Sequence, residues 1–583
     1  MKSKNLIYIT SALMIAFASC KKDSFLNRAP LSSISPQTFF NNETDLQLYC
    51  NQYYGNLPIQ TFLRADDNSD DKANQTINPL LAGTYTIPGS GPTPGTPADI
   101  SGTGAYSAGT ATINGTGTNW EFSLIRKCNF FLANVSKAQV SAAVKNEYIG
   151  ETLFFRANDF WKKVKAFGDV PYINKYITDT SKSYLYGPRT PHQQVMDSVL
   201  KDLNFAVANI PVTASQPGRI NQYAALALKA RICLWEGTYR KYFPNAGDPT
   251  PYLQGAVDAA EQIMSSGAFH IYTTGNPKSD YYNLFIQDEL QGNPEAILPM
   301  RYLAGILNND IDRQLIQNGD GYSKDFVNSI LCSDGLPISL SPLYKGDNTP
   351  DDEATNRDPR YKQQIGTRGF DILSGDTITL PRIGTTITST GYQCIKGHSN
   401  SAVAYNANQS TYDFFIFRYA ETLLIDAEAR AEMGTCTQDI LDKTVNLLRD
   451  RVGMPHMVIT SLKKDPQSDF PDVPVLIDEI RRERRVELGS EGFRFDDLHR
   501  WHAGTLINNP NTILGMKLTP ALKAEYAVEA PQLDVKDIVV DANNYIRVYP
   551  NFAHFTWNDK FYLYPIPTQE ITLNPQIKQN PGW

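Results

Sequence analysis

Carboxylates are the side chains most able to do chemistry in this 583-residue chain. Four of them cluster at Asp66, Asp67, Asp70 and Asp71, and a second acidic group covers 351–353. Glycoside hydrolysis needs two carboxyl groups about 5 to 10 Å apart, one with a raised pKa. Sequence spacing does not place any two of these groups across a sugar ring. The first cluster fits a calcium-type or a solvated acidic turn equally well.

Other signatures of catalysis and metal binding are missing or incomplete. No GxSxG, phosphate loop or dinucleotide fingerprint occurs in a strand-to-helix context. His499 and His502 are one helical turn apart beside Asp496, which is a spacing that a metal could use. However, there is no HExxH motif and no third ligand at a diagnostic distance. We therefore expect no catalytic residue, no metal and no cofactor, and we interpret both histidines as polar helix residues.

The arginine run RRERR at 481–485 could suggest a nucleic-acid surface, which needs clustered Lys and Arg without acidic neighbours. Here Asp478 precedes Arg482 by four residues and Glu487 follows Arg484 by three, so same-face pairs on a helix are expected. The whole chain has 54 Lys and Arg against 61 Asp and Glu, a net charge of −7. We predict a structural role for the run and no nucleic-acid partner.

Saccharides are bound through C–H faces that lie on aromatic rings and through hydroxyls that bond to Asp, Asn, Arg and Lys. The chain has 31 tyrosines, many of them in irregular segments, and these are the better source of a glycan platform. Trp120 follows a glycine-rich stretch and fits either a core or a platform role. The other tryptophans are expected in the core: Trp161, Trp235, Trp501, Trp557 and Trp583.

The first nineteen residues read as an export signal. A lysine-containing start precedes an apolar run from Leu6 to Phe17, and two small residues precede Cys20. The run is too short to cross a bilayer core of ~30 Å as a helix, and no later segment has eighteen consecutive apolar residues. FASC at 17–20 fits a bacterial lipobox, which predicts cleavage and acylation at Cys20 and a lipid anchor in the membrane. The alternative is ordinary cleavage nearby.

The six other cysteines are far apart and form no CxxC pair: Cys50, Cys128, Cys233, Cys332, Cys394 and Cys436. This spacing excludes a zinc ribbon. Export permits disulfides, but a chain of this length does not need them. We expect mostly buried free thiols.

Apolar residues recurring at three- and four-residue steps predict paired helices. The expected helices are 147–167, 190–210, 221–240, 252–266, 418–432 and 439–452. Such pairs resemble tetratricopeptide units, although the 34-residue period is not kept. The predicted fold is therefore mainly α, a helical-pair solenoid packed against a loop-rich half with a few short β-strands.

Two long stretches interrupt the helical pattern. Residues 82–119 are rich in Gly, Thr, Ser and Pro, so no helix can run through them. Loops of this length are typically functional or disordered, and both interpretations stay open. A second polar region covers 335–409 and alternates around 377–390, which predicts a few short strands there.

Ordered segments along nearly the whole chain resemble one family. They include SCKKDSFLNRAP at 19–30, RANDFWKKVKAFGDVPY at 156–172 and INQYAALALKARICLWEGTY at 220–239. The most specific are IRRERRVELGSEGFRFDDLHRW at 480–501 and YLYPIPTQEITLNPQIKQNPGW at 562–583. With these segments the chain resembles the SusD/RagB-type outer-membrane lipoproteins, which bind nutrients, chiefly glycans, beside a TonB-dependent transporter.

The resemblance implies a signal peptide at 1–19 and one domain at 20–583. Within this domain it implies helical pairs at about 122–266 and 418–452, ligand-face loops at about 60–120 and 275–410, and a C-terminal signature at 474–583.

The implied function is that of a surface-exposed lipoprotein without enzymatic activity. It would bind oligosaccharides and deliver them to a SusC-like TonB-dependent transporter, over which it acts as a lid. Three alternatives stay open: an oligopeptide receptor of the same family, a secreted glycoside hydrolase, and a scaffold with protein partners alone.

In the family, ligand contacts tend to come from the segment before the first helical pair and from the loop after a GNPEAIL-like stretch, here at 292–298. These are loop matches and not motif matches. The residues implied on this chain are Asp66, Asp67, Asn68, Asp70, Tyr85, Tyr106, Tyr302 and Tyr322.

Overall fold

A computed structural model of the chain describes residues 39–57, 66–67, 69–74, 77–85, 87, 120–178, 180–317, 321–384 and 387–583. The signal sequence, the predicted lipidation site Cys20 and the predicted ligand residues Asn68 and Tyr106 lie outside this part of the chain.

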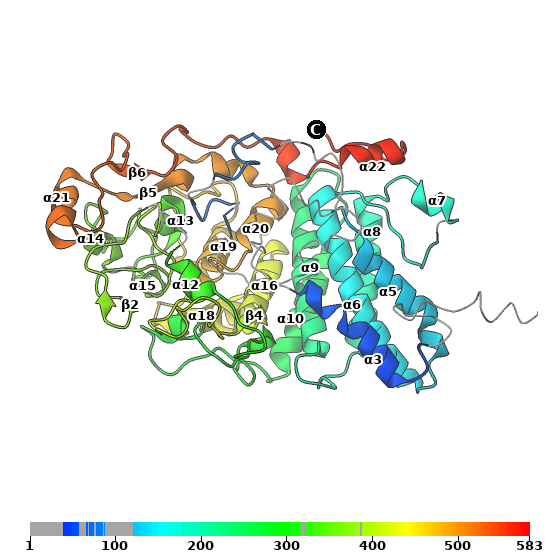
Figure 1. The fold of residues 1–583 in the computed structure, drawn as a ribbon. Helices are drawn as coiled ribbons and strands as arrows, with labels where there is room; N and C mark the ends of the chain where they lie inside the picture. The colour runs from blue at the N-terminus through cyan, green and yellow to red at the C-terminus, as the bar shows by residue number, and fades with distance from the viewer. Residues whose placement is uncertain are drawn as a thin grey trace, which may run out of the picture.

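Long helices fill one half of the molecule and continue through its middle to α16 and α19 (Figure 1). Each packs on the next, in the order α5, α6, α8, α9, α10, α16 and α19. Their bounds are Ser123–Asn134, Ala142–Phe167, His192–Asn209, Gln222–Tyr242, Thr250–Ser265, Tyr419–Glu432 and Val475–Glu487. The short helix α3, Glu43–Asn51, packs on α6. The prediction of a mainly α fold built from helical pairs is confirmed.

Local capping explains where several of these helices begin and end. The Ser141 hydroxyl accepts the backbone N–H of Val144 at the start of α6 (3.2 Å), and the Asn221 side chain does the same for Ala224 in α9 (2.9 Å). After α10 the chain turns at Gly267, whose φ of 67° suits a residue without a Cβ.

The pair α9–α10 needs a glycine at its crossing point. A Cβ on Gly237 would lie 2.9 Å from the backbone nitrogen of Leu253, closer than real Cβ atoms approach. The small residue therefore sets how closely the two helices pack.

The expected helix at 439–452 is in fact two helices, so this boundary was wrong. They are α17, Gln438–Lys443, and α18, Val445–Val452, and the break falls at Thr444, with φ −130° and ψ −93°. The Thr444 hydroxyl donates to the carbonyl of Ile440 (2.5 Å), so a β-branched side chain bonds to the backbone where the helix breaks.

The other half of the molecule consists mainly of loops, short helices and two-stranded sheets. Its helices are α11 Asp280–Asn283, α12 Ile311–Leu315, α13 Lys324–Ser329, α14 Pro350–Ala354, α15 Arg360–Gln364, α20 Arg494–Arg500 and α21 Pro520–Glu529. The short helices α7, Lys182–Leu185, and α22, Thr568–Leu573, lie near the long helices in the view of Figure 1.

Three antiparallel pairs make up the strands of the described residues. They are β1 Ala296–Met300 with β4 Phe414–Arg418, β2 Asp371–Leu373 with β3 Asp376–Thr377, and β5 Leu514–Lys517 with β6 Tyr545–Arg547. Of the region at 377–390 that alternates in sequence, only the first residue belongs to a strand. The polar region 335–409, where a few short strands were expected, contains β2 and β3, whereas the other four described strands lie outside it.

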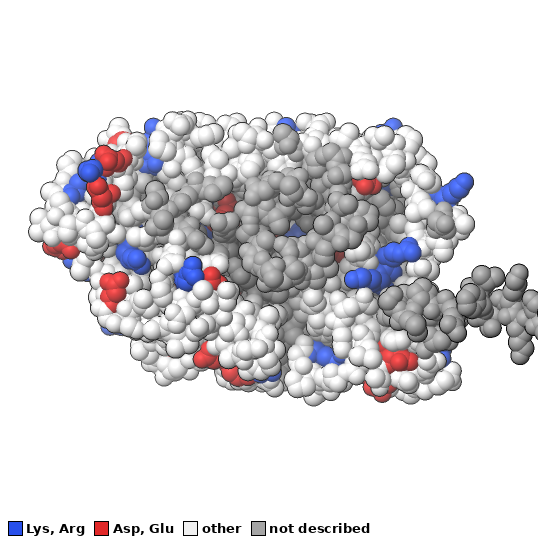
Figure 2. Space-filling view, in the orientation of Figure 1, with Lys and Arg blue, Asp and Glu red and all other residues white. Residues whose placement is uncertain are grey.

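The core contains the residues expected there, with one exception. The tryptophans at 120, 161, 235, 501 and 557 are buried, whereas Trp583 is only partly buried. The six described cysteines are free thiols, five of them buried and Cys436 partly so, which confirms the prediction. None of the described helices is long and apolar enough to cross a membrane. Figure 2 shows basic and acidic side chains interspersed on one face.

Candidate ligand-binding site

The acidic segment at 66–71 is tied to the chain more than 400 residues later. Asp66 accepts the backbone N–H groups of Gly492 (3.1 Å) and Arg494 (3.0 Å). Asp70 receives two hydrogen bonds from the Arg494 guanidinium (2.7 Å each), and Asp71 pairs with Arg485 (2.7 Å). All three carboxylates are buried, so these side chains hold the segment against the protein.

The other predicted ligand residues are spread over several environments. Tyr322 is fully buried and stacks on Phe326, with 4.3 Å between the ring centroids, and Tyr302 is also buried. Asp67 and Tyr85 are partly exposed. The ring of Tyr85 lies against Trp583, at 5.7 Å between centroids, so this predicted residue is part of a half-buried aromatic cluster. The structure therefore does not gather these tyrosines at one place.

The arginine run lies on α19 and is buried in ion pairs, which confirms its structural role. The expected partners were wrong, however. Arg482 pairs with Asp465 (2.8 Å) and Glu479 (3.3 Å), and Arg484 pairs with Asp497 (2.8 Å). Tertiary neighbours have replaced most of the same-helix partners, because α19 is enclosed on several sides.

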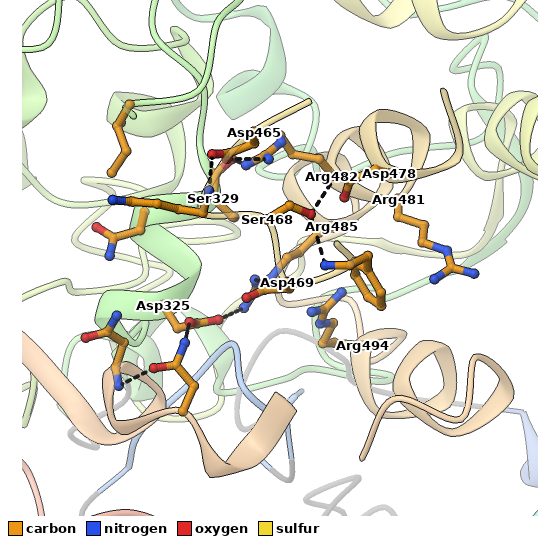
Figure 3. Close-up of a pocket in the computed structure, with 16 residues that line it drawn as sticks. Asp325, Ser329, Asp465, Ser468, Asp469, Asp478, Arg481, Arg482, Arg485 and Arg494 are labelled. Atoms are coloured by element: carbon orange, nitrogen blue, oxygen red, sulfur yellow. Dashed lines mark hydrogen bonds and ion pairs between the residues drawn. The ribbon is translucent and has the colours of Figure 1, made fainter. Parts of the chain in front are cut away.

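A polar pocket of about 370 Å³ opens beside α19 (Figure 3). Its walls come from α13, α19, the loop at 465–470 and residues near 509–511. The charged and amide side chains that line it are Asp325, Asp465, Asp469, Asp478, Arg481, Arg482, Arg485, Arg494, Asn328, Gln467, Asn509 and Asn511. Phe470 is its one aromatic residue among those described.

Arg485 holds one wall of this pocket together. Its guanidinium pairs with Asp71 and Asp325 (2.7 Å each) and with Asp70 and Asp469 (3.3 Å each). Burial opposes the ionisation of Asp70, but Arg485 and Arg494 outweigh it and lower the pKa of Asp70 to about 2. By contrast, burial reinforced by the neighbouring Asp469 carboxylate raises the pKa of Asp325 to about 7.

This arrangement suits binding through hydrogen bonds better than it suits catalysis. Ion pairs hold the pocket's charged groups in place, so a ligand hydroxyl meets donors and acceptors that are already oriented. Asp325 accepts from Arg485 through one oxygen and from Asn509 through the other (2.7 Å each). Both of its oxygens are thus engaged within the protein.

The raised pKa of Asp325 predicts a pH dependence of stability. Between about pH 4 and pH 7 the folded state holds a proton on Asp325 that the unfolded state has released, so the free energy of unfolding falls as pH rises. This one carboxyl contributes a slope of up to about 1.4 kcal/mol per pH unit. Asp325→Asn is expected to remove that slope in urea denaturation series, whereas Asp472→Asn, at an exposed position, keeps it. Equal slopes for Asp325→Asn and the unaltered protein would contradict the assignment.

A second cavity, of about 220 Å³, lies on the other side of residues 484–494 from the polar pocket. Arg484 and Phe493 line it, while their neighbours Arg485 and Arg494 line the polar pocket. The second cavity is bounded by α6, α9 and β4 and is rich in aromatic side chains.

The two histidines considered for metal binding pack on aromatic rings. His499 lies 5.4 Å and His502 lies 4.9 Å from Tyr562, measured between ring centroids. Burial, with Lys165 as the next contributor, lowers the pKa of His499 to about 3. Within the described ranges no three His, Cys, Asp or Glu side chains are placed to hold a metal ion.

The residues that line the two cavities were not predicted from the sequence as site residues. The stretch DPQSDFPD at 465–472 carried a loop signal in its Pro, Ser and Asp content, and its position directly before the arginine helix could have marked it. Asp325 carried no local signal, because its importance comes from a guanidinium 160 residues away.

Family models match two parts of the chain. Residues 301–583 match the model described as the SusD family. Residues 106–234 match the model described as "Starch-binding associating with outer membrane".

Curated relatives and solved structures extend this similarity over almost the whole chain. SusD-like protein P2 of Formosa agariphila is 23% identical over 100% of both chains. A SusD-like protein of Bacteroides ovatus is 26% identical over 86% of this chain and 83% of its own. The crystal structure of a SusD-like carbohydrate binding protein from Bacteroides fragilis covers 93% of this chain and 100% of its own, with 23% identity and a TM-score of 0.69.

Proposed function

Because the chain belongs to the SusD/RagB family, we propose that it is a glycan-binding lipoprotein of the outer membrane. It binds oligosaccharides outside the cell and delivers them, unaltered, to a SusC-like TonB-dependent transporter, over which it acts as a lid.

The observation that carries the binding proposal is the polar pocket beside α19. Its Asp, Arg, Asn and Gln side chains offer both donors and acceptors, as sugar hydroxyls require. Asp469 is the most accessible acid of the Arg485 cluster, with 29% of its side chain exposed. We place sugar contacts at Asp469, Gln467 and Asn511. The surface positions Asp67 and Tyr85 stay candidate contacts from the sequence prediction.

Similar proteins support this proposal. One matched family model is described as starch-binding and associated with the outer membrane, and the Bacteroides fragilis relative is described as carbohydrate binding. Acylation at Cys20 would hold the protein at the membrane beside its transporter. Such tethering raises the effective concentration of captured ligand at the transporter. A modest affinity for the ligand is therefore sufficient for its delivery.

Calorimetry against panels of neutral oligosaccharides and oligopeptides tests the binding proposal. We expect heat with at least one oligosaccharide and none with peptides. Asp469→Ala is expected to weaken that binding about 10- to 100-fold, because a hydrogen bond to a charged group contributes about 1.5–3 kcal/mol. Gln467→Ala is expected to weaken it less. The matched control is Asp472→Ala, an exposed acid in the same loop, which keeps full affinity.

Several outcomes would reject parts of this proposal. Binding of peptides alone would favour an oligopeptide receptor. New reducing ends after incubation with the bound glycan would reveal a glycoside hydrolase. Full affinity in both pocket variants would move the binding site away from the polar pocket.

A further inference from the structure

The side chains that line the second cavity include more cations than carboxylates. Six cationic side chains line it against four carboxylates. The cations are Lys162, Lys165, Arg231, Arg418, Arg484 and Arg500, and the carboxylates are Glu421, Glu491, Asp496 and Asp497.

Five of these six cations already have carboxylate partners. Arg231 makes two bonds of 2.6 Å to Glu421, and Lys165 pairs with Asp496. The other three pairings are Arg418 with Glu491, and Arg484 and Arg500 with Asp497. The carboxylates on the cavity wall are therefore engaged.

Lys162 is the exception. It has neither an ion pair nor a hydrogen bond to any residue that the structure describes. Asp159, one turn earlier on α6, bonds Lys163 instead (3.1 Å). Burial, partly offset by Asp159, lowers the pKa of Lys162 to about 8. The ammonium group of this partly buried side chain therefore lines the cavity without an ion pair to any described residue.

The remainder of the wall is apolar and largely aromatic, with Phe415, Phe417 and Phe493 among its side chains. Arg231 covers Phe417 at 4.4 Å and Phe493 at 5.0 Å, measured to the ring centroids. Aromatic surface beside an unpaired ammonium group suits a ring that carries an oxyanion, since the C–H face packs on the aromatics while the anion meets Lys162.

We infer that this cavity is a subsite for an acidic sugar residue, a pyranose bearing a carboxylate or a sulfate, with Lys162 as its counter-ion. This inference rests on the proposed glycan binding and extends it to the class of glycan. A neutral sugar would leave Lys162 without a counter-charge.

Calorimetry with matched ligands tests the inference. The first pair is an oligogalacturonate and its neutral methyl ester; the second is a sulfated galactose oligomer and its desulfated form. We expect the acidic member of one pair to bind about 10- to 100-fold more tightly than its neutral partner, and the responding pair identifies the anion. Lys162→Gln is expected to abolish this ratio while leaving the neutral ligand's affinity unchanged.

A control variant sharpens the result. Lys201→Gln removes an exposed lysine on α8 and is expected to keep the full ratio. Equal binding of acidic and neutral ligands, or an unchanged ratio in Lys162→Gln, would overturn the subsite while leaving glycan binding intact. Absence of binding to any glycan would instead reject the proposed function itself.

Discussion

Replacing Glu487 by glutamine is expected to destabilise the folded protein by about 3 to 5 kcal/mol. Glu487 is fully buried at the end of α19 and is the shared partner of three buried guanidinium groups. Arg451 bonds both of its oxygens (2.6 Å each), Arg418 bonds one (2.8 Å) and Arg360 the other (3.1 Å). These arginines hold the pKa of Glu487 far below its ordinary value despite its burial.

The size of the effect follows from what the substitution leaves behind. Glutamine has nearly the same shape, so little packing is lost, but three cations lose a shared negative charge in a place that water does not reach. Urea denaturation followed by tryptophan fluorescence measures the change.

The control is Glu529→Gln, which removes a carboxylate that pairs with Arg368 at the surface (3.2 Å). Exposed pairs contribute at most about 1 kcal/mol, so this variant should remain close to the unaltered protein. A Glu487→Gln protein as stable as the Glu529→Gln control would show that the arginine cluster does not depend on this charge.

Replacing Arg485 by methionine is expected to cost a similar 3 to 5 kcal/mol at neutral pH. The change removes the guanidinium that pairs with Asp71 and Asp325, and it removes one of the two cations beside Asp70. The loss should shrink as the pH is lowered toward 4, because protonation of Asp325 and its neighbours removes the repulsion among them. A purely steric effect of methionine would not depend on pH.

Arg368→Met provides the matched control for Arg485. Arg368 also has three carboxylate partners, Asp351, Glu525 and Glu529, but 40% of its side chain is exposed. Its replacement should cost about 1 kcal/mol or less. Thermal unfolding of the two variants across pH 4 to 8 separates the cases, and equal losses in both would refute the role of burial.

These two clusters explain how a half with few long helices keeps a defined shape. Arg485 joins the segment at 66–71 to α13 and α19, while Glu487 joins α15, β4 and α18 to the end of α19. Each ion pair has a specific geometry, so the loops have one preferred arrangement around α19. The polar pocket is a direct product of this arrangement.

The helical half was largely predictable because its signals are local. The stripe on α6, the Asn221 cap of α9 and the turn at Gly267 depend on residues within a few positions of one another. The two-helix break at Thr444 was missed, since a side-chain bond to Ile440 leaves no change in the apolar period.

The candidate site was predictable only in part. The acidic cluster was visible, but whether its carboxylates face a ligand or an arginine depends on Arg485 and Arg494, more than 400 positions away. In the same way, same-face pairs were expected for the arginine run, and partners from other elements replaced most of them.

By itself, the sequence determined the family, the helical pairs and the buried character of most tryptophans and cysteines, because periodicity and residue type act over short distances. Only the tertiary structure decided which charges meet, which donors remain unpaired and where the cavities open. Ion pairs form between side chains that are close in space. The spacing of residues along the chain shows neither which distant segments come close nor which side chains become buried.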